Sequence, residues 1–336
     1  MISYFASTAR HAPVTRPKHK NAHAPASGEA VPSAPARAAH PALPYAVLAA
    51  GVLVVSSASI LIRFAQGLGV PSLSLAAWRL TLAALILTPL ALTRSRAELA
   101  RLAPRDVGLA ALAGAFLAIH FAAWIASLAY TSVAASTVLV TTNPIWIAAA
   151  SWLVFRERPG PGLAAGIALA LAGSAAIFAA GGASSAAENP ALGNSLALIG
   201  SIMVSGYLLI GRFLRRRLSL LAYIWLVYGA AAGVLLLAVL ATGGPMLGFA
   251  AAAYAILLAL AVGPQLGGHT AFNWALRYLS PAFIAIAILG EPVGAALLAF
   301  LILGERVAPL ELAGFVLLLV GIYCAARAER RGAAAR

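Results

Sequence analysis

The sequence predicts an all-α polytopic membrane protein with ten transmembrane helices, arranged as two inverted five-helix repeats. Three observations support this fold class: the hydropathy of the chain, the placement of its Lys and Arg residues, and an internal repeat. Of the 336 residues, 62% are hydrophobic and only 10% are charged, with a mean hydropathy of +0.94. Soluble domains are about 45–50% apolar and about 25% charged, so most of this chain must lie in lipid.

The apolar segments have the length that a bilayer requires. A membrane-crossing helix needs about 20 apolar residues, within a range of about 17–25. From residue 44 onward, turn residues and charges divide the chain into ten predicted spans: 44–64, 71–92, 108–129, 133–155, 162–181, 193–214, 221–242, 249–276, 281–303 and 309–327. The connections between them are short, so almost no chain remains for a soluble domain.

The two ends of the chain differ from this pattern. Residues 1–43 are rich in Ala, Pro, His and basic residues and contain no apolar stretch typical of a cleavable signal. We expect a disordered, basic cytoplasmic tail here. Contact of this tail with anionic lipid is the less favoured alternative to a solvated tail. Residues 329–336 are predicted to form a short second cytoplasmic tail.

The positive charges predict the orientation. If the N-terminus is placed inside, 20 of the 23 Lys and Arg residues fall in the tails and inner loops, and only Arg63, Arg79 and Arg306 do not. Cytoplasmic loops of membrane proteins carry such an excess, so both termini are expected to be cytoplasmic. The net charge of +14 is then explained by topology, and no nucleic-acid partner is expected.

The internal repeat appears when the sequence is shifted by 148 residues. This shift aligns Pro144 with Pro292, Glu157-Arg158 with Glu305-Arg306, Gly166 with Gly314 and Gly173 with Gly321. One residue of slippage aligns Gly51 with Gly200, Ser56 with Ser205 and Arg63 with Arg212. The two repeats are predicted at 44–182 and 192–328. Because five spans is an odd number, the two halves must lie in opposite orientations.

Each repeat carries a helix-breaking site within its fourth span. Asn143 precedes Pro144, and Glu291 precedes Pro292, at matching positions. Proline removes a backbone donor and clashes with the preceding turn, so both helices are expected to kink. Transporters with inverted repeats bind substrate between the repeats, often at interrupted helices. The sequence therefore predicts a midplane cavity between the two halves, lined by the spans 71–92, 108–129, 133–155, 249–276 and 281–303.

The stretches that carry the breaks read "NPIWIAAASWLVFRER" and "GEPVGAALLAFLILGER". At these residues the sequence resembles the EamA-type permeases of the drug/metabolite transporter superfamily, over about residues 44–330. The resemblance implies an inner-membrane permease that exports small metabolites, since members handle amino acids, nucleosides, sugars or drugs. Asn143 departs from the pattern, because an acid could stand at this position. No motif identifies a substrate.

Glu291 is the first candidate for the functional site. It is the only acid near the middle of a predicted span, and an ionisable residue at that depth is costly and functional by default. It could couple transport to protons or bind a substrate amine. Equally, it could pair with an Arg or cap the kinked helix.

The eighth predicted span carries Gln265, His269 and Asn273 at a spacing of four residues. On an α-helix this spacing places all three on one face, which in lipid must point inward. The face could form a cavity wall, which the neighbouring small residues favour. The alternative is that these side chains make hydrogen bonds between helices.

Three further polar or aromatic residues complete the candidate set. His120 and Trp124 form an i, i+4 pair in the third span. Histidine changes charge near neutral pH and could link transport to protons, and Trp124 could stack on an aromatic substrate. Both could equally be packing residues. Arg79, early in the second span, could snorkel outward, or pair with Glu291 or with a substrate carboxylate.

The function class follows from this set of residues. We expect a secondary transporter that works by alternating access, with a small-molecule substrate, the lipid bilayer and possible proton coupling as partners, as a monomer or homodimer. A passive channel is the alternative, and an intramembrane enzyme is less favoured, because Asp106, the only Asp, is expected in a loop and no predicted span contains Lys. The chain has a single cysteine, Cys324, which excludes a Cys-based metal site. No metal and no cofactor are expected.

Overall fold

The computed structural model describes residues 42–131, 133–156, 160–181, 189–303 and 308–334. Within these residues every regular element is a helix, as predicted for an all-α protein. The first repeat contains α1 (Leu43–Val55), α2 (Ala58–Gly67), α3 (Ser72–Arg94), α4 (Arg96–Leu99), α5 (Pro104–Tyr130), α6 (Val133–Val140), α7 (Asn143–Phe155) and α8 (Pro161–Gly181). The second contains α9 (Pro190–Arg215), α10 (Leu220–Thr242), α11 (Ala251–Leu260), the π-helix η2 (Ala261–His269), α12 (Thr270–Ala275), α13 (Pro281–Ile288), α14 (Glu291–Leu303) and α15 (Pro309–Ala334).

Eight helical segments of the described chain are long and apolar enough to cross a membrane. They are Leu43–Gly67, Ser72–Arg94, Pro104–Tyr130, Pro190–Arg215, Leu220–Thr242, Ala251–Ala275, Pro281–Leu298 and Leu312–Arg331. The other two predicted spans, 133–155 and 162–181, correspond to α6 with α7 and to α8, which contributes a shorter apolar stretch. The chain is therefore a multi-pass helical membrane protein, and the count of ten spans stays a prediction.

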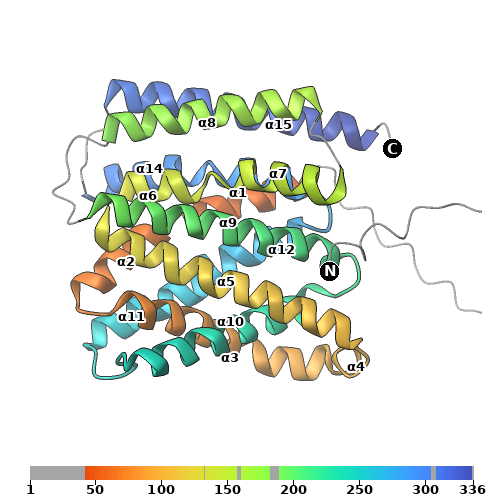
Figure 1. Cartoon of the computed structure of the whole chain (residues 1–336), viewed down its shortest axis with the longest axis vertical. Helices are drawn as coiled ribbons and strands as arrows, with labels where there is room; N and C mark the ends of the chain where they lie inside the picture. Colours follow the sequence, from red (N-terminus) through yellow and green to blue (C-terminus); the bar gives the residue numbers. More distant parts are fainter. Residues whose placement is uncertain (1–41, 132, 157–159, 182–188, 304–307, 335–336) are drawn as a thin grey trace, which may run out of the picture.

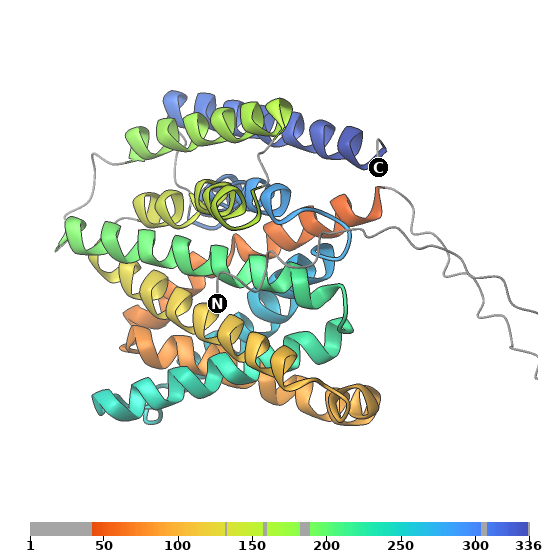
Figure 2. The ribbon, with the colours of Figure 1, turned by 45° about the vertical axis from the view of Figure 1, so that its right-hand side comes forward.

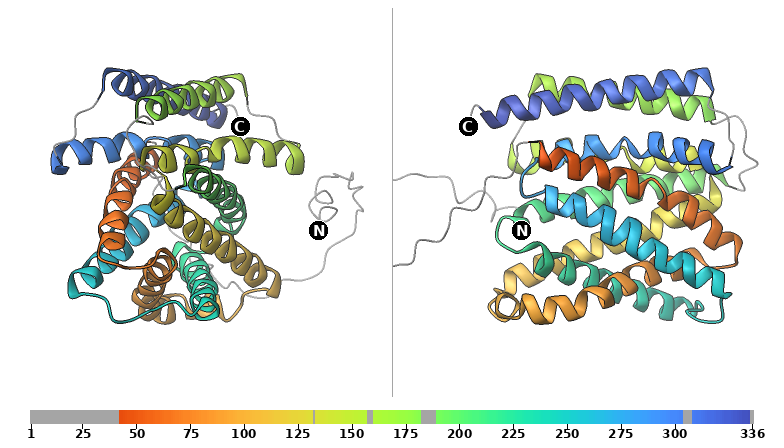
Figure 3. Two further views of the ribbon diagram at one scale, coloured as in Figure 1. Left: turned by 60° about the vertical axis from the view of Figure 1, so that its left-hand side comes forward. Right: turned by 180° about the vertical axis from the view of Figure 1, so that it is seen from behind.

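The helices lie roughly side by side and are stacked in layers (Figure 1). Helices α8 and α15 pair along their lengths as an outer layer, and the paired breaks of α6–α7 and α13–α14 lie in the layer beneath them (Figures 2 and 3). Below that layer, α5 packs along α9, and α10 packs on α3 and α5. The predicted tail 1–43 lies almost entirely outside the described residues, and so do the paired Glu-Arg motifs. The segment 329–334, expected as part of a tail, instead continues α15 as a helix.

Repeat-related glycines bring α8 and α15 into backbone contact. A Cβ placed on Gly173 would lie 2.5 Å from the Leu318 nitrogen, and one placed on Gly321 would lie 2.5 Å from the Ala170 nitrogen. Small residues let helix backbones approach closely in this way. In lipid the hydrophobic effect does not drive helices together, so close van der Waals packing stabilises the pair. The fifth helix of each repeat therefore packs against its own counterpart.

Adding one methyl group at this contact should separate the two helices. We expect Gly173→Ala to lower the free energy of unfolding by about 1–3 kcal/mol, because the new Cβ meets backbone atoms that cannot rotate away. Gly233→Ala on α10 is the matched control, since a Cβ there meets nothing within 4 Å and alanine favours a helix by about 1 kcal/mol over glycine. Denaturation in mixed detergent micelles measures both variants. Equal stabilities would contradict the glycine contact.

The two predicted helix breaks are confirmed. Helix α6 ends at Val140 and α7 begins at Asn143, while α13 ends at Ile288 and α14 begins at Glu291. In both cases the proline is the second residue of the new helix, where its missing N–H would have no partner inside the helix anyway. The sequence position of the proline thus decides where each helix restarts.

Two irregularities differ from the predicted spans. The first span is interrupted at Ser56-Ser57, where both hydroxyls bond back to carbonyls of the preceding turn, Ser56 Oγ to Val52 O and Ser57 Oγ to Val54 O, each at 2.8 Å. Such back-bonding bends helices. The second irregularity is η2, which contains Pro264 and replaces regular α-helix in the middle of the predicted span 249–276.

Candidate functional site

A small cavity lies beside both helix breaks. Among the described residues, four of the five predicted spans line it, but span 71–92 does not, and the first helix of each repeat lines it instead. Its volume is about 30 Å³, which is room for one or two water molecules. Ten of the described residues that line it form five pairs. In each pair the two residues are 148 or 149 positions apart, so that the repeat alignment makes them equivalent. The pairs are Val55 with Val204, His120 with His269, Trp124 with Phe272, Val140 with Ile288, and Asn143 with Glu291. The cavity therefore lies on the pseudo-symmetry axis between the repeats.

The equivalence of His120 and His269 is a feature that sequence reasoning missed. The register with one residue of slippage, which aligns Ser56 with Ser205 in the first span of each repeat, also aligns these two histidines in the third. The signal was therefore present in the sequence. The structure shows its meaning, because both histidines line the same cavity.

The first helix of each repeat packs against the break of the other repeat. Ser205 on α9 donates its hydroxyl to the Asn143 carbonyl at 3.3 Å, where α7 begins. The equivalent residue Ser56 lies against α14, because a Cβ placed on Gly294 would collide with the Ser56 Oγ. Each break is thus held by a serine of the opposite half.

The two cavity histidines differ in their hydrogen bonding. The Nδ1 of His120 lies 2.9 Å from the Gly200 carbonyl oxygen. Because a carbonyl only accepts, this nitrogen carries the proton, and in the neutral ring Nε2 is an acceptor. The Nδ1 of His269 is buried and has no hydrogen-bond partner in the part of the chain that the structure describes. The imidazole of His269 packs against Phe121 and Phe272 instead.

Three other cavity residues carry buried polar atoms whose hydrogen-bonding capacity is unused within the described chain. These atoms are Glu291 Oε1, Asn143 Oδ1 and Trp124 Nε1. The Trp124 indole stacks on the His120 ring with centroids 5.9 Å apart and an interplanar angle of 13°. Buried polar groups nearly always have a partner, protein or water. Their concentration around one cavity indicates a place where a ligand or water completes the bonding.

Arg79 does not snorkel outward, contrary to one of the three alternatives expected for it. Its side chain is fully buried, with Nε donating to Gln265 Oε1 at 2.9 Å and the guanidinium carbon 4.1 Å from the centre of the Phe121 ring. Phe121 also contacts the cavity residue His269. Arg79 is absent from the cavity lining within the described residues, and the Phe121 ring lies on one face of its guanidinium.

The predicted single face of Gln265, His269 and Asn273 is divided by the structure. The i→i+5 bonding of η2 changes the angular spacing that an α-helix would give. Only His269 lines the cavity. Gln265 holds Arg79, and the Asn273 amide accepts from the Tyr207 hydroxyl at 2.5 Å and donates to Tyr228 at 3.1 Å.

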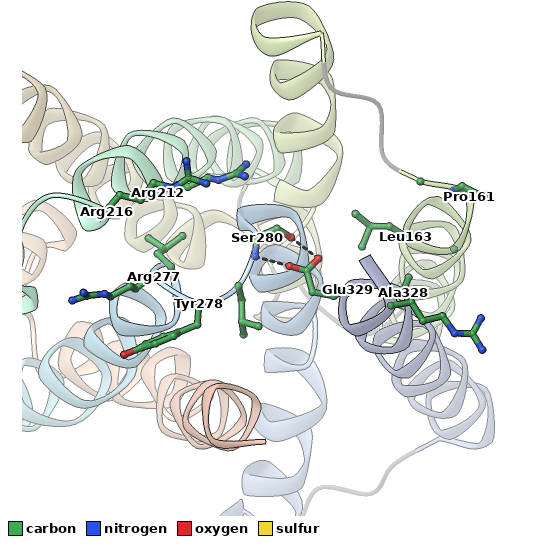
Figure 4. Close-up of a pocket in the computed structure, with 14 residues that line it drawn as sticks. Pro161, Leu163, Arg212, Arg216, Arg277, Tyr278, Ser280, Ala328 and Glu329 are labelled. Carbon is green, nitrogen blue, oxygen red and sulfur yellow. Dashed lines mark hydrogen bonds between the residues drawn. The ribbon is translucent and has the colours of Figure 1, made fainter. Parts of the chain in front are cut away.

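A larger pocket of about 580 Å³ opens at the arginine-rich ends of the helices. Figure 4 shows Glu329 of α15 accepting from both the backbone nitrogen and the hydroxyl of Ser280, at 2.8 and 2.9 Å. Arg277 points away from this contact (Figure 4). Arg212 on α9 and Arg216, which directly follows this helix, also line the pocket. The pocket is away from both helix breaks, so the small cavity is the better candidate for substrate recognition.

Metal binding finds no support in the described part of the chain. No group of three or more His, Cys, Asp or Glu side chains lies close enough together there to hold an ion.

Comparison with known proteins agrees with this architecture. A sequence model of the family described as "EamA-like transporter family" matches residues 43–179 and 191–327, which confirms the resemblance seen in the sequence. A solved crystal structure of a protein with 19% sequence identity matches 86% of this chain and 98% of its own, with a TM-score of 0.69. At that identity it supports the fold alone. No curated protein matches this chain.

Proposed function

Because the chain belongs to the EamA-like transporter family, we propose that it is a secondary transporter that exports small metabolites by alternating access. The observation that carries this proposal is the cavity on the repeat axis, lined by equivalent residues of both halves and by polar atoms that lack partners within the described chain. The proposed substrates are amino acids, nucleosides or drug-like compounds. The proposed location is a bacterial-type inner membrane, with both termini cytoplasmic.

A difference between the two repeats supports alternating access. In the second repeat, η2 packs against α1, which ends at the Ser56-Ser57 interruption. The equivalent contact of the first repeat joins α5 and α9, both of which are continuous α-helices. Two halves with related sequences thus hold different conformations in one molecule.

Exchange of these conformations would open the cavity to the opposite side. The histidines mark the change. His120 is bonded to Gly200, whereas the Nδ1 of His269 has no partner within the described chain and Gly51, the equivalent of Gly200, packs on Gly268. In the opposite state we expect the His120 bond to break and a bond from His269 to the Gly51 carbonyl to form. Inverted repeats in transporters commonly work by such rigid-body or gating motions around a fixed site.

Counterflow in proteoliposomes tests the transport function. Thermal-shift screening of the purified protein against amino acids, nucleosides and common drugs first identifies a compound that raises its stability by mass action. Vesicles loaded with that unlabelled compound should then take up the labelled compound faster than empty vesicles, because a carrier returns faster when loaded. Protein-free vesicles are the control. Uptake that is fast but unaffected by internal compound would indicate a channel and overturn the proposal.

A further inference from the structure

The cavity wall has an unbalanced charge. Glu291 is the only acidic side chain among the described residues that line it, and no Arg or Lys lines it there. The guanidinium of Arg79, which does not line the cavity, donates to Gln265 and has one face on the Phe121 ring. We propose that the transported compound is an organic cation, namely a protonated amine whose N–H groups bind Glu291 and its neighbours. This inference rests on the proposed transport function and adds the substrate class.

The hydrogen-bonding groups of the wall favour an N–H donor. The Tyr207 hydroxyl donates to Asn273, and the Thr141 hydroxyl donates to the Thr137 carbonyl at 2.8 Å. Both oxygens therefore have only lone pairs left to offer a ligand. The Nε2 of His120 is also an acceptor, because Nδ1 is the donor to Gly200.

The atoms without partners in the described chain add to this excess of acceptors. Glu291 Oε1 and Asn143 Oδ1 are acceptors, and among these atoms only Trp124 Nε1 is an obligatory donor. An ammonium group brings several donors and no acceptor, so it complements this wall. A carboxylate brings only acceptors and would face Glu291 and these lone pairs.

Aromatic side chains of the cavity wall are available to a cation. Trp124, Phe272 and Tyr207 all line the cavity, and a cation near an aromatic face is stabilised by the ring quadrupole. An amine with an attached apolar or aromatic group matches both the hydrogen-bond acceptors of the wall and its aromatic side chains.

Carbodiimide labelling of Glu291 tests this inference without measuring transport. Dicyclohexylcarbodiimide is apolar and modifies buried carboxyl groups, and mass spectrometry of the purified full chain reports the rate at Glu291. Four indoles of similar size but different charge compete: tryptamine, tryptophol, tryptophan and indole-3-acetate. At about ten times its dissociation constant a ligand leaves about a tenth of the protein free, so tryptamine should slow labelling about tenfold. The other three should slow it much less.

Two controls identify the labelled site. Glu291→Gln should remove the modified peptide, and labelling of Glu329, which lies outside the cavity, should be unaffected by any indole. Protection by tryptophan or indole-3-acetate equal to that by tryptamine would overturn the cation class, and so would equal labelling rates with all four. Counterflow of a zwitterion or an anion would overturn this inference while leaving the proposed transport function intact. Absence of any counterflow would instead count against the transport function.

Discussion

Replacing Glu291 by Gln is expected to slow substrate counterflow by roughly 10- to 100-fold. The substitution keeps the size of the side chain but removes the acidic charge from the described cavity wall. Hydrogen bonds that involve a charged group contribute about 1.5–3 kcal/mol, and each 1.36 kcal/mol corresponds to about a factor of ten. The variant should also lose any response to an imposed pH gradient, because an amide cannot exchange a proton. Initial counterflow rates with and without a gradient measure both effects.

The repeat offers a matched control for this variant. Asn143 is the equivalent of Glu291 and lines the same cavity, so Asn143→Asp in the Glu291→Gln background moves the acid across the pseudo-symmetry axis. Partial recovery of counterflow is expected if the cavity wall is functionally symmetric. The single variant Glu291→Gln should fold normally, since burying an amide costs less free energy than burying a charge. Undiminished transport that still responds to the pH gradient would exclude a coupling role for Glu291.

The features that could be predicted from the sequence depend on local chemistry. The kinks at Asn143-Pro144 and Glu291-Pro292 follow from the missing N–H and the fixed backbone angle of proline, which act in any surroundings. Hydropathy likewise identifies apolar segments without knowledge of their neighbours. These two signals were enough to predict the membrane fold and the positions of the two breaks.

The features that were not predicted depend on contacts between distant segments. A serine pair in a helix usually remains helical, and the interruption after α1 occurs where Ser56 packs against Gly294, 238 positions later in the chain. The π-helix η2 similarly occurs where Gly268 packs so closely on α1 that an added Cβ would collide with Val55 Cγ2. No single-segment pattern contains either contact.

The same distinction, between local signals and contacts of distant segments, separates the candidate site residues that were correctly grouped from those that were not. His120, Trp124, His269, Asn143 and Glu291 line the cavity, and the repeat register alone relates four of them as pairs. In contrast, the spacing of four residues predicts that Gln265, His269 and Asn273 share one face. The wider turn of η2 changes their angular positions, and they contact different partners. Predicting a cavity wall from α-helical periodicity fails wherever a helix is not α-helical.

Replacing Gln265 is expected to lower the free energy of unfolding more than replacing Asn273, which is the other side-chain amide on η2 and α12. The Gln265 Oε1 accepts from the Nε of Arg79, whose side chain is fully buried. The two terminal nitrogens of this guanidinium have no hydrogen-bond partner within the described chain. Gln265→Leu would therefore leave a buried charge with only the Phe121 ring in contact with its face. Removing the partner of a buried polar group costs about 1–3 kcal/mol, and more where the group left behind is charged.

A second variant separates the charge from the amide. Arg79→Met alone leaves Gln265 without its partner, at a cost of about 1–3 kcal/mol. The double variant Arg79→Met/Gln265→Leu should be more stable than Gln265→Leu, because replacing both members of a buried polar pair by apolar residues is often neutral or favourable. The coupling energy from such a cycle isolates the interaction of the two side chains. Unfolding free energies in mixed micelles provide all four corners of the cycle.

Gln66→Leu is the matched control for this cycle. The Gln66 amide donates to the Ser72 hydroxyl and to the Ile125 carbonyl, both at 3.0 Å, so its partners are neutral. Its replacement should cost only about 0.5–1.5 kcal/mol per bond. If Gln265→Leu costs no more than Gln66→Leu, then the Arg79 charge does not depend on Gln265. The guanidinium would in that case be stabilised chiefly by Phe121 and by the carboxylate of Glu291, and Phe121→Leu would become the variant with the larger effect.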